Sequence, residues 1–112
     1  MVTLDKSIKL LYHDSMSLAQ VHITKQAQKQ LAKAPLHIRQ SFVAWAESVE
    51  RVGLVESRLT AGRHDEPLSG QRQGQRSVRL NKQWRAIYEV SANGQITLVD
   101  VKEVTPHDYR TR

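Results

Sequence analysis

Two arginines, Arg79 and Arg85, are the first candidates for chemistry, because a short hairpin places them opposite each other. If the turn holds three residues, Leu80 faces Trp84 and the two arginines become a direct pair, on the face away from the aliphatic side chains. Like charges across an antiparallel pair repel, and an anion held between two guanidinium groups removes that penalty. The alternative is that both side chains extend into solvent, or that one pairs with Glu89.

Two side chains near the C-terminus are candidates for proton transfer. His107 follows the last predicted strand, and an imidazole acts as a general acid or base near neutral pH. Tyr109 is suited to stack on a base or to assist a proton transfer. A single histidine or tyrosine in a tail more often has no chemical role. Their function therefore depends on whether the sheet brings this tail beside the arginine pair.

The remaining reactive residue types point away from metals and cofactors. The chain has no cysteine, which excludes disulfides, zinc–thiolate sites, iron–sulfur clusters and thiol nucleophiles. Its five histidines are scattered, and no HExxH pattern surrounds His64. Gly70 and Gly74 lack the strand–loop–helix context of a phosphate-binding loop. We expect neither a metal nor another cofactor.

The charge is basic and unevenly spread. The 112 residues carry a net charge of +6, and no acidic residue lies between Glu66 and Glu89. The basic residues of that window are Arg72, Arg76, Arg79, Lys82 and Arg85. A stretch of one sign suits nucleic acid or an acidic partner protein, and it is equally typical of a solvated face.

Length and hydropathy restrict the class of protein. A chain of 112 residues that is 39% hydrophobic fits one globular domain with a modest core. No apolar run reaches the roughly 18–20 residues of a membrane helix, and the apolar stretch near the N-terminus is too short for a signal peptide. We expect a cytoplasmic protein without membrane association.

Helical elements are predicted in the first half of the chain. Residues 21–23 are a strand candidate, and Thr24 is a suitable cap for a helix that runs to Lys33. Pro35 suits the first turn of a second helix, which Gly53 ends. Apolar residues recur in this second helix at steps of three and four, which places them on one stripe. They are Ile38, Phe42, Trp45, Val49 and Val52.

Beyond Gly53 the apolar period changes to alternation. Residues 54–63 are ambiguous and residues 64–67 read as a loop. Strands are predicted at 77–80, 84–91 and 95–104, with Asn93-Gly94 as a hairpin signal. In the last strand the apolar set shifts from Ile96 and Leu98 to Val99 and Val101, which indicates a bulge or two covered faces.

This order of elements predicts an α+β fold. An N-terminal strand and two helices pack on a mostly antiparallel, twisted sheet. Residues 1–20 are interpreted as an N-terminal extension and residues 21–112 as the single domain.

The segment from Leu68 to Tyr88 resembles the central hairpin of HigB-like toxins, which belong to the RelE/ParE superfamily of bacterial toxin–antitoxin systems. The resemblance lies in the pattern LSGxRxGQxSxRxNxQWR, which is specific for its length. The order of elements from residue 21 to residue 109 is also similar to that of a RelE-like domain.

This resemblance implies a ribosome-dependent endoribonuclease, an mRNA interferase that inhibits translation without a metal. The ribose 2′-OH attacks the adjacent phosphate, and basic residues stabilise the phosphorane-like transition state. The implied roles are Arg79 and Arg85 as phosphate clamps, His107 as acid to the 5′-oxygen and Tyr109 as an aid to stacking or proton transfer. The expected RNA-binding residues are Arg72, Arg76, Lys82 and Trp84.

The implied partners are mRNA, the ribosome with its ribosomal RNA, and a cognate antitoxin encoded beside the toxin. The implied state is a monomer or a toxin–antitoxin hetero-oligomer. The sequence identifies no general base, because arginine is too basic to accept a proton near pH 7.

Two other functions fit the same fold. A ParE-like toxin inhibits DNA gyrase by protein contact, and a basic module binds nucleic acid without chemistry. Convergence of Arg79, Arg85 and His107 favours the nuclease over the gyrase inhibitor. The scarcity of aromatic side chains, with one Phe, two Trp and three Tyr, counts against a stacking module.

Overall fold

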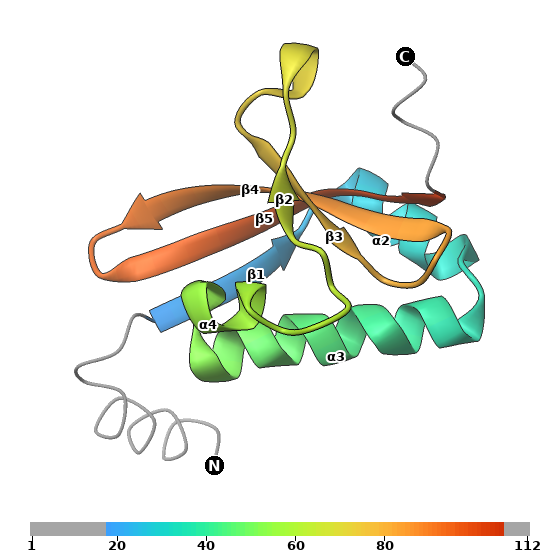
Figure 1. Cartoon of the computed structure of the whole chain (residues 1–112), viewed down its shortest axis with the longest axis horizontal. Helices are drawn as coiled ribbons and strands as arrows, with labels where there is room; N and C mark the ends of the chain where they lie inside the picture. Colours follow the sequence, from blue (N-terminus) through green and yellow to red (C-terminus); the bar gives the residue numbers. More distant parts are fainter. Residues whose placement is uncertain (1–17, 107–112) are drawn as a thin grey trace.

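The computed structural model describes residues 18–106, which form one sheet with helices packed on one face (Figure 1). The strands described are β1 (Leu18–Ile23), β2 (Glu66–Pro67), β3 (Gln75–Arg79), β4 (Trp84–Asn93) and β5 (Ile96–Pro106). The helices are α2 (Lys25–Lys33), α3 (Leu36–Val52), α4 (Leu54–Arg58) and the short 3-10 helix η1 (Gly70–Arg72). The sheet order is β1-β5-β4-β3-β2, with β1 parallel to β5 and all other pairs antiparallel. The predicted α+β class is confirmed.

The helix boundaries follow from the residues predicted to set them. The Thr24 hydroxyl accepts a hydrogen bond from the Ala27 amide at 3.1 Å, which caps α2. Pro35 is the N-cap of α3, and Gly53 ends that helix with a φ of 88° that favours glycine. The α3 stripe packs into the core against the sheet, and none of the helices described is long and apolar enough to cross a membrane. The buried α3 residues are Ile38, Phe42, Trp45 and Val49.

The β3–β4 hairpin has the predicted register. Arg79 pairs with Arg85 and Val78 with Ala86, and the Leu80 amide donates to the Trp84 carbonyl at 2.9 Å. The two aliphatic members of this register, Val78 and Ala86, are fully buried beneath the helices. The arginine pair therefore lies on the opposite face of the sheet, because neighbouring residues of a strand point to opposite faces.

The predicted irregularity in β5 is a bulge. Ile87 pairs with Glu103 but the next residue, Tyr88, pairs with Val101, so Lys102 is an extra residue on β5. The bulge inverts the alternation of β5, so that Val101 and Val104 both enter the core. By the same shift, Glu103 points to the face that carries the arginine pair.

Several boundaries differ from the sequence predictions: β3 begins at Gln75 instead of Ser77, and β4 and β5 each extend two residues further than predicted. β1 begins at Leu18 instead of Val21, because pairing with β5 extends to residues that show no clear period. Residues 66–67, predicted as loop, form the edge strand β2, where Pro67 is tolerated because an edge needs fewer amide donors. The second hairpin turn is Gly94-Gln95, because Asn93 still pairs with Ile96.

Candidate functional site

The sheet face away from the helices is polar and gathers residues from four strands. Because opposed residues of an antiparallel pair share a face, the register groups them into two rows. Arg79 and Arg85 form one row with Thr105, and Ser77 and Ile87 form the next with Glu66 and Glu103. We call this side of the sheet the polar face: Glu66, Ser77, Arg79, Arg85, Ile87, Glu103 and Thr105. Ser77, Arg85 and Ile87 of this set are buried.

The arginine pair lies at one end of the polar face. Arg85 is only 6% exposed, and its Nη1 donates to the Ser77 hydroxyl at 3.3 Å. Arg79 is half-buried, and within residues 18–106 its buried Nε has no hydrogen-bond partner. Two guanidinium groups in direct cross-strand register repel each other, and burial weakens the screening by water. This arrangement favours a bound anion between them.

One acid of the polar face is already neutralised. Glu103 Oε2 lies 3.0 Å from Arg72 Nη1, and its Oε1 accepts from Arg72 Nη2 at 3.4 Å. Arg72 Nη1 also donates to Gln75 Oε1 at 3.0 Å. Arg72, predicted to bind RNA, is therefore an ion-paired side chain beside the polar face, where it orients Glu103.

Glu66 is the acid of the polar face that has no such partner within residues 18–106. Its carboxylate is exposed at the sheet edge, directly opposite Ser77, which lies two residues before Arg79 on β3. An exposed carboxylate beside a cationic pair is suited to accept a proton from a substrate that the cations hold. Glu66 was not among the predicted site residues, although Glu66 is the acid that precedes the basic segment with Arg79 and Arg85.

Two predicted RNA-binding residues are placed away from the polar face. Arg76 Nε donates to Asp65 Oδ1 at 2.7 Å, and the Asp65 side chain is only 1% exposed. Burial alone lowers the pKa of Arg76, but the hydrogen bond and charge of Asp65 outweigh it and raise the pKa. Trp84 packs against the core cluster instead of presenting its ring to a ligand. Both residues therefore have structural contacts within the described part of the chain, and their RNA-binding role stays a prediction.

Tyr88 completes the contacts of Asp65. The Tyr88 hydroxyl donates to the second oxygen of this carboxylate. Burial and the bond to Asp65 raise the pKa of Tyr88 to about 12. The ring of Tyr88 lies 5.4 Å from that of Trp45, so Asp65 ties the segment before β2 to the core.

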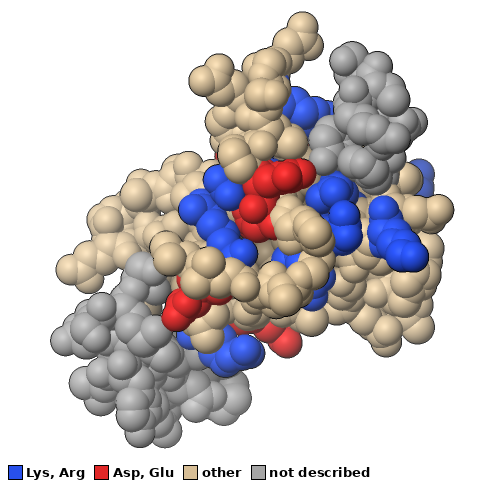
Figure 2. All heavy atoms as spheres, viewed as in Figure 1, with Lys and Arg blue, Asp and Glu red and all other residues tan. Residues whose placement is uncertain are grey.

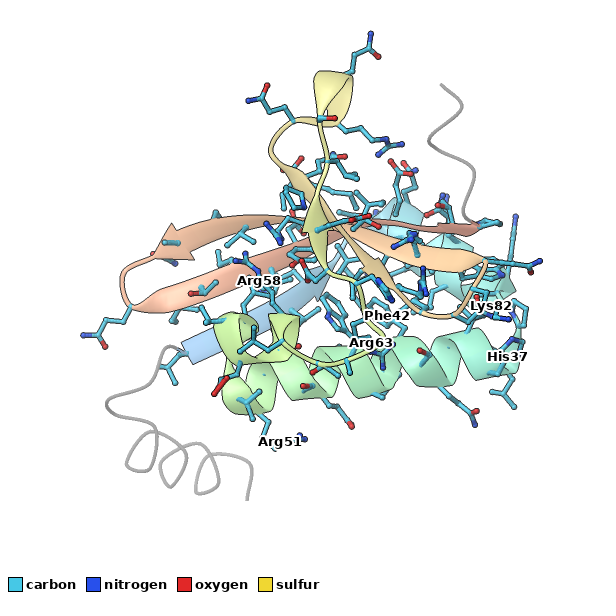
Figure 3. The ribbon with its side chains drawn as sticks, in the orientation of Figure 1. His37, Phe42, Arg51, Arg58, Arg63 and Lys82 are labelled. Atoms are coloured by element: carbon cyan, nitrogen blue, oxygen red, sulfur yellow. The ribbon has the colours of Figure 1, made fainter. Side chains whose placement is uncertain are left out.

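Lys82 and Arg63 lie at another concave surface. An open hollow of 580 Å³ lies where the turn after β3 meets the loop before β2 and the start of α3. Arg63 lies between α3 and the sheet in Figure 3, while Lys82 lies beside His37 at the end of the hairpin. Burial lowers the pKa of Arg63. Arg63 was not among the predicted site residues, because it lies in a segment whose apolar residues show no regular period.

Charge is unevenly distributed over the surface. Figure 2 shows Lys and Arg side chains gathered around a smaller acidic group near the middle of the view. No three His, Asp or Glu side chains of residues 18–106 gather into a metal-binding group. His107 and Tyr109, predicted to take part in catalysis, lie outside the described residues.

Comparisons with solved structures identify the fold. A YoeB/ParE toxin from Agrobacterium tumefaciens superposes with a TM-score of 0.62 at 16% identity, covering 80% of this chain and 99% of that one. The toxin–antitoxin complex RelBE2 from Mycobacterium tuberculosis gives 0.57 at 21% identity, covering 79% and 96%. The archaeal RelE–RelB complex from Pyrococcus horikoshii OT3 gives 0.57 at 22% identity, covering 81% and 96%. No protein-family model and no curated protein matches. The chain therefore has the fold of the RelE-like toxins.

Proposed function

We propose that this protein is the toxin of a type II toxin–antitoxin system and cleaves mRNA on the ribosome without a metal. The observation that carries the proposal is the cross-strand pair of Arg79 and Arg85, with the carboxylate of Glu66 on the same face. The hairpin pattern from Leu68 to Arg85 supports a HigB-like member, and the RelE-like fold supports the superfamily.

The reaction is an attack of a ribose 2′-oxygen on the adjacent phosphorus. Glu66 accepts the proton of the 2′-OH as the O2′–P bond forms, which supplies the base that arginine cannot be. The P–O5′ bond then breaks, and a proton passes to the leaving 5′-oxygen from His107. The products are a 2′,3′-cyclic phosphate and a 5′-OH end, with no change in oxidation state. Tyr109 assists the proton transfer or stacks on the base.

Arg79 and Arg85 stabilise the transition state. The phosphorane carries more negative charge than the diester, so donors fixed on two adjacent strands bind it more tightly than the substrate. The bond from Arg85 to Ser77 holds one guanidinium in place before the substrate arrives. Arg72 acts through Glu103. Its ion pair with this carboxylate keeps the negative charge of Glu103 away from the bound phosphate.

The proposed partner is an antitoxin whose acidic residues cover the arginine pair. The similar RelBE2 structure from Mycobacterium tuberculosis is a toxin–antitoxin complex. Charge complementarity with a basic face speeds association and selects the partner. Cleavage on translating ribosomes places the reaction in the cytoplasm.

Primer-extension mapping of a test mRNA on stalled ribosomes tests the proposal. We expect the wild type to cut the message at the ribosome, and Glu66→Gln to slow cleavage by about 10²–10⁴-fold. Arg79→Ala is expected to slow it by about 10²–10³-fold. Glu47→Gln, an exposed acid on α3, is the matched control and should cleave like the wild type.

Two outcomes would contradict the proposal. An intact message with the wild type sinks the nuclease, and inhibition of gyrase supercoiling by the same sample would identify the ParE-like function instead. Cleavage that survives Glu66→Gln unchanged removes Glu66 as the base. A shift of the acidic limb in the pH–rate profile distinguishes loss of a base from loss of binding.

A further inference from the structure

The open hollow beside the polar face has a basic lining from three segments. Ser41 comes from α3, Arg63 from the loop before β2, and the residues from Arg79 to Lys82 from the end of β3 and its turn. The Arg79 amide donates to the Arg63 carbonyl at 2.7 Å, which continues the sheet edge beyond β2. The hollow is therefore a fixed part of the fold, and Arg79 connects it to the proposed catalytic pair.

The cations of the hollow form no ion pair with any acid of the described residues. The residues that line the hollow include no Asp or Glu, and within residues 18–106 neither Arg63, Arg79 nor Lys82 forms an ion pair. Elsewhere the fold neutralises arginines with acids, as for Arg72 and Arg76. The hollow thus concentrates uncompensated positive charge at a concave, partly desolvated surface, where an anion is bound most effectively.

Within the described part of the chain, the bonds that orient Arg63 all go to neutral oxygens. Its Nη1 donates to the Ser41 hydroxyl at 2.8 Å and to the Arg79 carbonyl at 3.1 Å, and its Nη2 donates to the Ser41 carbonyl at 3.4 Å. These bonds leave part of the guanidinium fork for another acceptor, because arginine has five N–H donors. A guanidinium that is half-buried, held in place and not neutralised is preorganised for a phosphate or carboxylate.

We propose that this hollow is a second phosphate subsite, which holds a backbone phosphate of the RNA strand next to the one at Arg79 and Arg85. The inference rests on the proposed function for the identity of the strand. Arg63 supplies the guanidinium contact, Lys82 an exposed charge at the rim, and Asn81 an amide donor beside them. Arg79 belongs both to the arginine pair and to the lining of the hollow. A phosphate held in the hollow therefore fixes which nucleotide of the RNA strand lies beside Glu66.

The lining favours a nucleic-acid strand over an acidic peptide. Peptide docking depends on apolar anchors that become buried in the interface. Among the lining residues described, the large apolar one is Leu80, which is only 6% exposed because it is part of the core. Backbone phosphates need only charge and donors, which the hollow provides. An acidic peptide is therefore the outcome that the experiment must distinguish.

Binding of fluorescein-labelled 2′-O-methyl oligonucleotides to the full chain tests the subsite. These probes lack the attacking 2′-OH, so anisotropy reports binding without cleavage. A pentanucleotide is expected to bind more tightly than a dinucleotide, because it reaches both phosphate positions. Lys82→Gln should weaken the pentanucleotide about threefold to fivefold and leave the dinucleotide unchanged. It should also reduce the slope of log K against log salt by about 0.7.

Two variants control this experiment. Lys29→Gln removes an equal charge from the exposed side of α2 and should leave the length dependence intact. Arg63→Gln should give a larger loss than Lys82→Gln, and thermal unfolding shows whether it still folds. Because Lys82 is exposed and bonds to no described residue, Lys82→Gln decides the question if Arg63→Gln does not fold.

The proposal is overturned by any of three results. In the first, the wild type does not bind the pentanucleotide. In the second, Lys82→Gln and Lys29→Gln lose equal affinity for it. In the third, a polyglutamate peptide displaces the pentanucleotide from the wild type but not from Lys82→Gln. Failure of the proposed catalysis gives a different pattern. In that case Glu66→Gln leaves cleavage unchanged or no cleavage is seen, while the Lys82-dependent gain with probe length persists.

Discussion

The two ends of β3 each carry an arginine, and the two arginines differ in whether an acid neutralises them. At the start of the strand, Arg76 is bonded to the buried carboxylate of Asp65 and has a raised pKa. At its end, Arg79 stands opposite Arg85, and within residues 18–106 it forms no ion pair. Both residues are half-buried and belong to one short strand. Charge compensation, rather than residue type or burial, separates them.

The difference assigns the arginines to different roles. A paired arginine stabilises the fold only while its acid is present, because removing one partner leaves a charge with poor solvation. Two arginines in direct cross-strand register repel each other, which lowers the stability of the fold and increases its affinity for an anion. We therefore expect stability to depend on the Arg76 end of β3, and ligand binding on the Arg79 end.

The largest expected effect is the loss of Asp65. Asp65→Ala removes the carboxylate that accepts hydrogen bonds from both Arg76 and the Tyr88 hydroxyl. We expect the free energy of unfolding to fall by about 2–4 kcal/mol, slightly below the range for a fully buried pair because Arg76 is partly exposed. Urea denaturation measures this change.

Asp100→Ala is the matched control for Asp65→Ala. Its partner Lys102, at 3.1 Å, is exposed like Asp100, so the loss of stability should be much smaller than that of Asp65→Ala. Equal losses for the two variants would break the comparison, because Asp65 would then act as an ordinary surface acid.

The next effect is an alkaline loss of stability that depends on Tyr88. Its pKa is raised from 10.0 to about 12, so the folded state retains a proton that the unfolded state releases. The stabilisation is fully present below pH 10 and is lost as the pH rises towards 12, by about 2–3 kcal/mol in total. Urea midpoints between pH 9 and pH 11.5, compared with those of Tyr88→Phe, isolate this contribution. Parallel curves for the two proteins would contradict it.

The features predicted correctly from the sequence are those that depend on residues close together in the chain. The pairing of Arg79 with Arg85 follows from turn length, and turn length fixes register within a hairpin. The α3 stripe and its end at Gly53 follow from periodicity and capping, and the bulge in β5 follows from a break in alternation. Each of these needs only neighbouring residues.

The features that separate Arg76 from Arg79 are not local. Arg76 is neutralised by a residue eleven positions earlier, in a segment that reads as a loop. Glu66 belongs to a strand of two residues, which is too short to show alternation, and only its pairing with Ser77 places it on the polar face. Arg63 was missed for the same reason, because its environment is built by Ser41 of α3 and the end of β3.

The smallest expected effect sharpens the comparison most. Arg79→Gln removes one of two opposed charges and a buried Nε without a described partner, while the backbone bonds of residue 79 remain. We expect the free energy of unfolding to stay constant or to rise by up to about 0.5 kcal/mol, with a larger rise at low salt because repulsion is then less screened. Arg76→Gln, in contrast, should lower it by about 1–3 kcal/mol by leaving Asp65 buried with a weaker donor. Urea midpoints at low and high salt measure both variants. A loss above about 1 kcal/mol for Arg79→Gln would show that this arginine stabilises the fold, and the absence of an acid would then no longer separate binding arginines from structural ones.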